Sequence, residues 1–238
     1  MQQGLQIEPG QPGGGITAMQ TQADRYNEVD ISHAKALPDA LSYMDTSLRT
    51  GILHRPNGLF PPEDEVLRVL QQKGYKPFEK HLLDVQSNAL VPSFHSWAAG
   101  NDAANHGLDL RCFLDIDTVE EMVGAKLFAA VRFGDLASIG NGMSAHGGAI
   151  ETALDEATAE LAKITNGVAC VTSSIEYKLK KKVRLHRTYK IDAEIVKVGP
   201  GGLRIYIDAF LKDLDGSVLV ACAAQMANIA KLKSARRA

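Results

Sequence analysis

The stretch "SAHGGAIETALDEATAELAKITNG", residues 144–167, has the pattern of one long amphipathic helix. Its apolar residues recur at offsets of three, four and seven, which is the spacing of a single helix face, and Asn166-Gly167 is a typical helix end. That face consists of Ile150, Ala153, Leu154, Ala157, Leu161 and Ile164. We therefore expect the helix to lie on a sheet, with Glu151, Asp155 and Thr158 as neighbours on its remaining surface.

Two glycines, Gly147 and Gly148, open this helix although glycine weakens helices. The first N–H groups of a helix have no acceptor within the helix, and the helix dipole favours negative charge at that end. Without Cβ atoms in the way, a ligand can touch these N–H groups. The pattern indicates an oxyanion hole, which stabilises the charge that develops on a carbonyl oxygen in acyl transfer. The alternative is that the glycines permit close packing against a strand.

Acyl transfer also needs a base or a nucleophile, and Asp155 is the candidate on the same helix. It lies eight residues after Gly147, which corresponds to about 12 Å at about 1.5 Å per residue. Groups so far apart on one helix cannot act on one carbonyl carbon. Joint action therefore requires two copies of the chain, which a two-fold dimer with facing helices supplies. The alternative is that Asp155 belongs to a solvated helix face with Glu151 and Glu156.

Extended runs on both sides of the helix predict an α+β fold, because runs of strands dominate over alternation of strands and helices. The linkers "GPGG" and "DLDG" are hairpin signals. The expected strands span residues 108–116 and 125–134 before the helix, and 167–177, 182–198, 203–213 and 217–232 after it.

The rest of the chain divides by composition. Residues 1–30 are rich in Gln, Gly and Pro and form an arm that we expect to be disordered or bound to a partner. Residues 31–105 have helix signals at 38–51 and 61–74 and are expected to be a helical extension. The main domain then spans 106–232, and 233–238 is a basic tail.

Composition excludes several classes of protein. The chain has 238 residues, 45% of them apolar, and a net charge of -2, which is typical of a globular protein. It has no apolar run of eighteen residues, so we expect no membrane span. Cys112, Cys170 and Cys222 stand in strand-like runs without metal-ligand spacing, so we expect reduced core cysteines and no metal site.

The segment "HGGAIETALDEA", together with "FGDLASIGNGMSAHGGAI" upstream, resembles the helix signature of hotdog-fold acyl-CoA thioesterases, in particular the carboxy-terminal-modulator-like mitochondrial branch. The resemblance covers roughly residues 108–230. It implies a hotdog fold, in which a six-stranded antiparallel sheet wraps a long central helix, in a homodimer. It also implies a hydrolase of fatty acid metabolism, located in mitochondria or otherwise in the cytoplasm, with coenzyme A present only as part of the acyl-CoA substrate.

By this resemblance, Gly147 and its neighbour His146 take the oxyanion-hole position. Asp155 takes the position of the carboxylate that activates water or attacks the thioester. In relatives an Asn before the glycine pair assists the reaction, and Asn141 stands near that position.

Relatives also use a Ser or Thr early in the strand that follows the helix. Alignment on Tyr177 puts Cys170 at that position, with Thr172 two residues and Ser173 three residues beyond it. A register shift or a bulge would restore the hydroxyl group, with Thr172 as the candidate. Without it, the site is impaired.

The segment "KLKKKVRLHRTYK", residues 178–190, has seven Lys or Arg and no acid. If it is a strand, alternate side chains share one face: Lys178, Lys180, Lys182, Arg184 and His186. The first four would then bind the phosphates of coenzyme A. The alternative is a solvated strand whose lysines discourage unwanted pairing. Nucleic-acid binding is disfavoured, because no aromatic stacking platform accompanies the cations.

Three functions follow from these features. The first is a thioesterase that hydrolyses fatty acyl-CoA at a dimer interface. The second is an impaired hotdog domain that serves as a structural subunit of a larger complex, such as a mitochondrial one, and docks through its N-terminal extension. The third is a hotdog dehydratase that uses His146.

Overall fold

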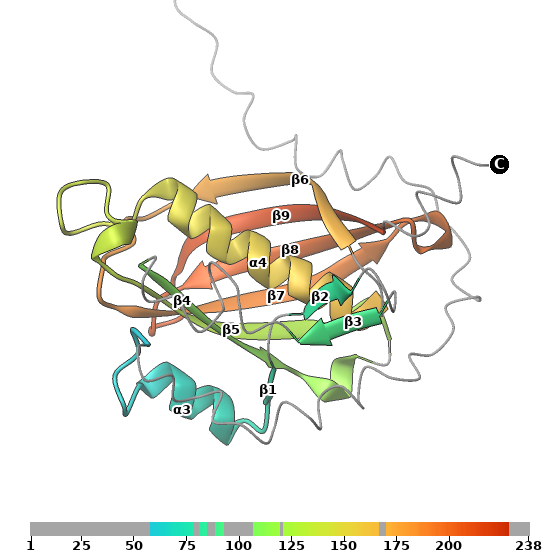
Figure 1. The fold of residues 1–238 in the computed structure, drawn as a ribbon, viewed down its shortest axis with the longest axis horizontal. Helices are drawn as coiled ribbons and strands as arrows, with labels where there is room; N and C mark the ends of the chain where they lie inside the picture. The colour runs from blue at the N-terminus through green and yellow to red at the C-terminus, as the bar shows by residue number, and fades with distance from the viewer. Residues whose placement is uncertain are drawn as a thin grey trace, which may run out of the picture. The chain divides into compact units, whose positions relative to one another are not determined.

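The computed structural model describes residues 58–78, 81–84, 89–92, 107–119, 121–166 and 170–228. The main sheet of this part of the chain has seven antiparallel strands in the order β1-β4-β5-β7-β8-β9-β6 (Figure 1). These strands are β1 (Lys76–Phe78), β4 (Leu108–Leu114), β5 (Lys126–Phe133), β6 (Cys170–Leu179), β7 (Thr188–Val198), β8 (Arg204–Lys212) and β9 (Val218–Asn228). A separate ladder pairs β2 (His81–Asp84) with β3 (Ala89–Pro92).

The long helix α4 (Gly147–Asn166) packs across strands β4 to β9 on one face of this sheet (Figure 1). All six residues of its predicted apolar face are buried, and they share one core with the inner faces of the strands. This arrangement of a long helix held by an antiparallel sheet is the hotdog fold, as predicted. Within the described residues, no helix is both long enough and apolar enough to cross a bilayer.

Thr158 corrects the predicted helix surface. Its side chain is fully buried, and its hydroxyl group donates a hydrogen bond to the backbone oxygen of Leu154 at 2.9 Å. Because the sheet curves around the helix, the buried surface is wider than the apolar stripe alone. Asp155 and Glu151 remain partly exposed.

The strand predicted at 182–198 begins only at Thr188. The chain between β6 and β7 leaves the sheet, and His186 has a φ of 58°, in the left-handed region that non-glycine residues rarely adopt. A continuous strand through this segment is therefore wrong. Both predicted hairpins are confirmed, with Gly201 at φ 62° between β7 and β8 and Gly216 at φ 81° between β8 and β9.

Helix α3 (Glu65–Gln72) covers the sheet face opposite α4. It confirms the helix predicted within 61–74, and its Val66, Leu67 and Leu70 pack with Phe113 of β4 and Ala130 of β5. The short strand β1 follows α3 and pairs with β4, so the sheet has seven strands instead of the predicted six. The extension predicted as helical therefore also contains strands.

Two buried carboxylates attach this extension to the sheet. Asp109 Oδ2 accepts hydrogen bonds from the Leu59 N–H group at 2.9 Å and from Arg111 Nη2 at 3.0 Å. Asp64 caps α3 by accepting from the N–H groups of Val66 and Leu67, and it also accepts from the Thr188 hydroxyl group of β7. The helix predicted at 38–51, the arm 1–30 and the tail 233–238 lie outside the described residues.

Substitution of Asp64 by Ala is expected to destabilise the protein by roughly 2 to 4 kcal/mol, because it removes a helix cap and leaves a buried hydroxyl group without its acceptor. Urea denaturation measures this change in the free energy of unfolding. Glu65→Ala, on the exposed side of the same turn, is the control and should change it by less than about 0.5 kcal/mol. Equal effects of both substitutions would contradict the assigned role of Asp64.

Candidate active site

The Asp155 carboxylate on α4 lies next to the Thr172 hydroxyl group on β6. Thr172 Oγ1 donates a hydrogen bond to Asp155 Oδ1 at 2.5 Å, and both side chains are partly buried. In the described part of the chain, Asp155 Oδ2 has no hydrogen-bond partner. The carboxylate is therefore held by one oxygen, and the other is available to a water molecule or a ligand.

A β-bulge brings Thr172 to this position. The ladder between β6 and β9 shifts register between Thr172 and Ser174, so that Ser173 is the extra residue. Ser173 donates its hydroxyl hydrogen bond to the Gln225 backbone oxygen and is exposed. Cys170 also faces the core, where it is buried. Of the residues considered for the hydroxyl role, the structure thus brings Thr172 to Asp155.

Two further side chains, Tyr177 and Cys222, lie close enough to the Asp155 carboxylate to feel its charge. Sequence reasoning did not assign either of them to the site. Tyr177 pairs with Cys222 across the β6–β9 ladder, and its hydroxyl group donates to the Glu151 backbone oxygen at 3.1 Å. Burial raises the pKa of the Cys222 thiol to about 12, and the Asp155 and Asp208 carboxylates add to the rise. Burial also raises the pKa of Tyr177. Both groups therefore stay protonated at neutral pH, so the Cys222 thiol is not an activated nucleophile. The alternation of inward and outward side chains along β9 is the sequence signal that could have placed Cys222 on the inner face.

The N-terminus of α4 carries the predicted oxyanion position. His146 precedes the helix, and its Nδ1 accepts a hydrogen bond from the Gly148 N–H group at 3.0 Å, so the imidazole acts as a helix cap. In the described part of the chain, the Gly147 N–H group has no acceptor. A Cβ atom at Gly147 would meet nothing within 4 Å, whereas one at Gly148 would lie 3.2 Å from His146 Nδ1. No described residue therefore fills the space beside the Gly147 Cα atom.

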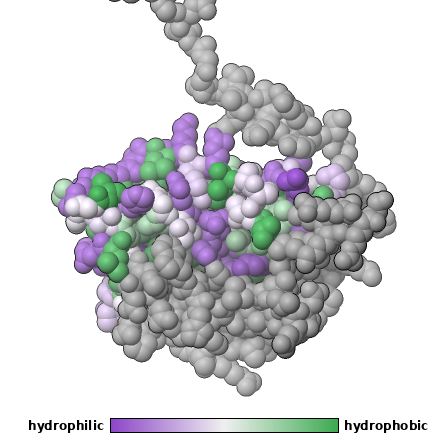
Figure 2. All heavy atoms as spheres, turned by 45° about the horizontal axis from the view of Figure 1, so that its top comes forward, coloured by the Kyte–Doolittle hydropathy of each residue, from purple (hydrophilic) through white to green (hydrophobic). Residues whose placement is uncertain are grey.

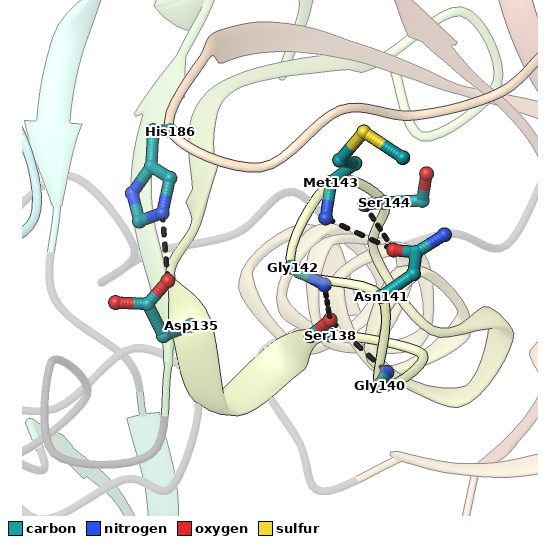
Figure 3. Close-up of polar contacts among 8 residues, drawn as sticks. All are labelled: Asp135, Ser138, Gly140, Asn141, Gly142, Met143, Ser144 and His186. Atoms are coloured by element: carbon teal, nitrogen blue, oxygen red, sulfur yellow. Dashed lines mark hydrogen bonds and ion pairs between the residues drawn. The ribbon is translucent and has the colours of Figure 1, made fainter.

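Asn141 organises the loop that leads to this helix (Figure 3). Its Oδ1 accepts hydrogen bonds from the N–H groups of Met143 at 2.9 Å and Ser144 at 3.1 Å. Ser138 Oγ accepts in the same way from Gly140 and Gly142. The structure thus gives the amide oxygen of Asn141 a role in shaping the loop.

The four cations proposed to contact coenzyme A do not share one strand. Lys178 is on β6, whereas Lys180, Lys182 and Arg184 lie in the connection between β6 and β7, and all four are exposed. Burial still alternates in the connection, because Val183 and Leu185 are buried between the exposed cations. Contact with phosphates stays a prediction for these residues.

Within one protomer the two halves of the candidate site stand apart. Gly147 is the first residue of α4 and Asp155 is its ninth, about 12 Å farther along the axis. Thr172 joins Asp155, while His146 and Asn141 lie at or before the helix start. The Gly147 N–H group and the Asp155 carboxylate of one chain are therefore too far apart to contact the same carbonyl group.

No protein-family model and no curated protein matches this sequence. Among solved structures, a hypothetical thioesterase protein with coenzyme A from Streptococcus pneumoniae TIGR4 is similar, with 18% identity and a TM-score of 0.42 over 50% of this chain and 88% of that chain. The protein smu.793 from Streptococcus mutans UA159, bound to acetyl CoA, has 21% identity and a TM-score of 0.40 over 45% and 84%. The PaaI protein of the E. coli phenylacetic acid degradation operon has 16% identity and a TM-score of 0.43 over 53% and 83%.

Proposed function

We propose that this protein is an acyl-CoA thioesterase that hydrolyses fatty acyl-CoA to a free acid and coenzyme A. The observation that carries the proposal is the Asp155 carboxylate, which is fixed by the Thr172 hydroxyl group at one oxygen and open at the other. The reaction needs water and the thioester, and none of its steps requires a metal ion or a further cofactor.

Asp155 supplies the base in the proposed reaction. Its free oxygen accepts a proton from a water molecule as the water oxygen attacks the thioester carbonyl carbon. The carbon–sulfur bond then breaks, and the sulfur of coenzyme A leaves with that proton. Direct attack by the carboxylate, followed by hydrolysis of the anhydride, is the other route open to the same geometry.

Gly147 supplies the oxyanion site. Its N–H group has no acceptor among the described residues, and the dipole of α4 favours negative charge at this end. Its φ is not positive, and a Cβ atom would meet no atom of the described residues within 4 Å, so neither backbone strain nor a close contact in this part of the chain requires glycine here. A ligand that must approach the N–H group does account for it.

The complete site needs two copies of the chain. Strand β6 is the last strand of the sheet order, and no other described strand pairs with its outer edge. Val171 and Leu179 on this strand are 46% and 53% exposed. In the coloured part of Figure 2, hydrophobic residues are likewise mixed with hydrophilic ones on the surface. Pairing of two β6 edges about a two-fold axis would run both α4 helices antiparallel, with Gly147 of one near Asp155 of the other.

One reason for the alternative of a structural subunit was a displaced hydroxyl group in the site; the docking arm at residues 1–30 lies outside the described residues. The bulge at Thr172 removes that reason, because it supplies the hydroxyl group. No described contact favours the dehydratase, since the Nδ1 atom of His146 accepts from its own helix. Location in mitochondria stays a prediction.

Substitution of Asp155 by Asn is expected to lower kcat for acyl-CoA hydrolysis by about 100-fold to 10,000-fold, because the amide cannot accept the proton. Release of the free thiol from a panel of acyl-CoAs measures the rate. Glu156→Gln, which removes the neighbouring acid on α4, is the matched control. Equal rates for wild type and Asp155→Asn would refute hydrolysis by this site.

Substitution of Thr172 by Val is expected to lower kcat by roughly 10-fold to 100-fold with little change in KM, because hydrogen bonds to charged groups contribute about 1.5 to 3 kcal/mol. Thr172→Ser should restore most of the rate. Ser173→Ala removes the adjacent hydroxyl group, which bonds to Gln225 instead, and should leave the rate unchanged. A larger loss of kcat for Ser173→Ala than for Thr172→Val would mean that Ser173, and not Thr172, donates to Asp155 in the active protein.

Hybrid dimers test whether the site is shared. Gly147→Val and Asp155→Asn chains are each expected to be inactive alone. A hybrid of the two has one site with both groups intact, so random mixing should recover about a quarter of wild-type activity under two-fold symmetry. A site contained in one protomer predicts no recovery on mixing.

A further inference from the structure

Two segments that are separate in the sequence lie side by side next to the start of α4. The loop 135–146 leads into α4, and the connection 180–187 joins β6 to β7 (Figure 1). The Ala145 N–H group donates to the Val183 oxygen at 2.9 Å, and the Leu185 N–H group donates to the Met143 oxygen at 3.1 Å. They therefore form one surface, called here the end surface.

The loop exposes three large apolar side chains on this end surface. Leu136, Ile139 and Met143 are 72%, 51% and 61% exposed. The loop is ordered, because the Ile139 N–H group donates to the Ser144 oxygen at 3.0 Å and Ser138 Oγ accepts from two glycine N–H groups (Figure 3). Three exposed large apolar side chains within residues 136–143 of one hydrogen-bonded loop are consistent with a surface that contacts a partner.

The connection adds cations beside these apolar side chains. Lys180, Lys182 and Arg184 are exposed, and no carboxylate in the described part of the chain lies within ion-pair distance of them. Val183 and Leu185 alternate with these cations in the sequence, and their buried side chains anchor the connection to the core. The Tyr189 hydroxyl group accepts from the Arg184 N–H group and donates to the Arg184 oxygen, which fixes the backbone here.

Acids near the end surface do not cancel this charge. Asp135 pairs with His186 at 2.9 Å, Asp213 lies 3.4 Å from Arg187, and the Asp215 carboxylate is close enough to Lys181 to feel its charge. The two segments contain five Lys or Arg and one Asp; with Asp213 and Asp215 counted as well, the net charge is 5 - 3 = +2 with neutral histidines, on a chain of net charge -2. The end surface thus combines exposed apolar side chains with a net positive charge, although the chain as a whole is negative.

We propose that the end surface docks the protein on an anionic lipid bilayer. Leu136, Ile139 and Met143 would enter the headgroup region, while the cations contact lipid phosphates and carboxylates. A second copy of the chain fits less well, because a two-fold contact would bring like charges together. The proposal does not depend on thioester hydrolysis.

Flotation of the full chain with vesicles tests the docking. Wild type should float with phosphatidylcholine vesicles that contain about 30% phosphatidylserine, and binding should weaken as salt is raised. Each cation near such a surface strengthens binding about fivefold, so K180Q/K182Q/R184Q should weaken it on the order of 100-fold. L136S/I139S/M143S should also abolish flotation.

Matched variants remove similar groups elsewhere. R68Q/K73Q/K76Q removes three exposed charges from α3 and its surroundings, and V123S/V196S removes exposed apolar side chains; both should float like wild type. Absence of wild-type flotation, or equal flotation of all variants, overturns the proposal. The proposal is also overturned if only the cation variant loses flotation and free coenzyme A displaces the wild-type protein from the vesicles. That result would mean that the cations bind the substrate. A smaller oligomer of the apolar variant in size-exclusion chromatography would instead assign the surface to contact between copies.

Discussion

Burial of the apolar face of α4 against the sheet determines where every other part of the site can lie. Ile150, Leu154, Leu161 and Ile164 are at most 7% exposed, and each such side chain contributes about 1.5 to 3 kcal/mol on burial. With the helix held in this orientation, Asp155 points to β6 and the helix start opens at the edge of the domain. The roughly 12 Å between Gly147 and Asp155 follows from helix geometry alone, and it is the reason that the proposed chemistry requires a second chain.

The pairing of Asp155 with Thr172 shows how one irregular residue in a strand can decide the chemistry of a site. In a regular strand, side chains alternate between the two faces, and the inner-face series from Tyr177 would lead to Ser173. The bulge inserts one residue, so Thr172 turns inward to Asp155 and Ser173 turns outward to Gln225. The partly buried Tyr177 and the buried Cys222 both stay protonated at neutral pH, which is consistent with the proposal that the carboxylate acts as the base.

The extension before the domain is part of the fold in the residues that the structure describes. Helix α3 covers part of the sheet face opposite α4, and Asp64 and Asp109 bind this layer to the sheet by buried hydrogen bonds. Among the described residues, the β6 edge has no partner strand and the end surface exposes large apolar side chains, so both can contact partners. The first suits a second copy, because backbone groups at a strand edge can pair with the same edge. The second has the charge and apolar character of a surface for lipid.

The sequence by itself determined the central helix, its buried stripe, the antiparallel strands around it and both hairpin turns, because periodicity and turn residues report local backbone preference. It also predicted Gly147 and Asp155 as site residues and fixed their separation along the helix, since helix rise is independent of context. Only the tertiary structure decided that Thr172 meets Asp155, because a bulge depends on how β6 pairs with β9. The end of the basic strand at the left-handed His186, the burial of Thr158 and the seventh strand β1 were likewise set by packing between segments distant in the sequence.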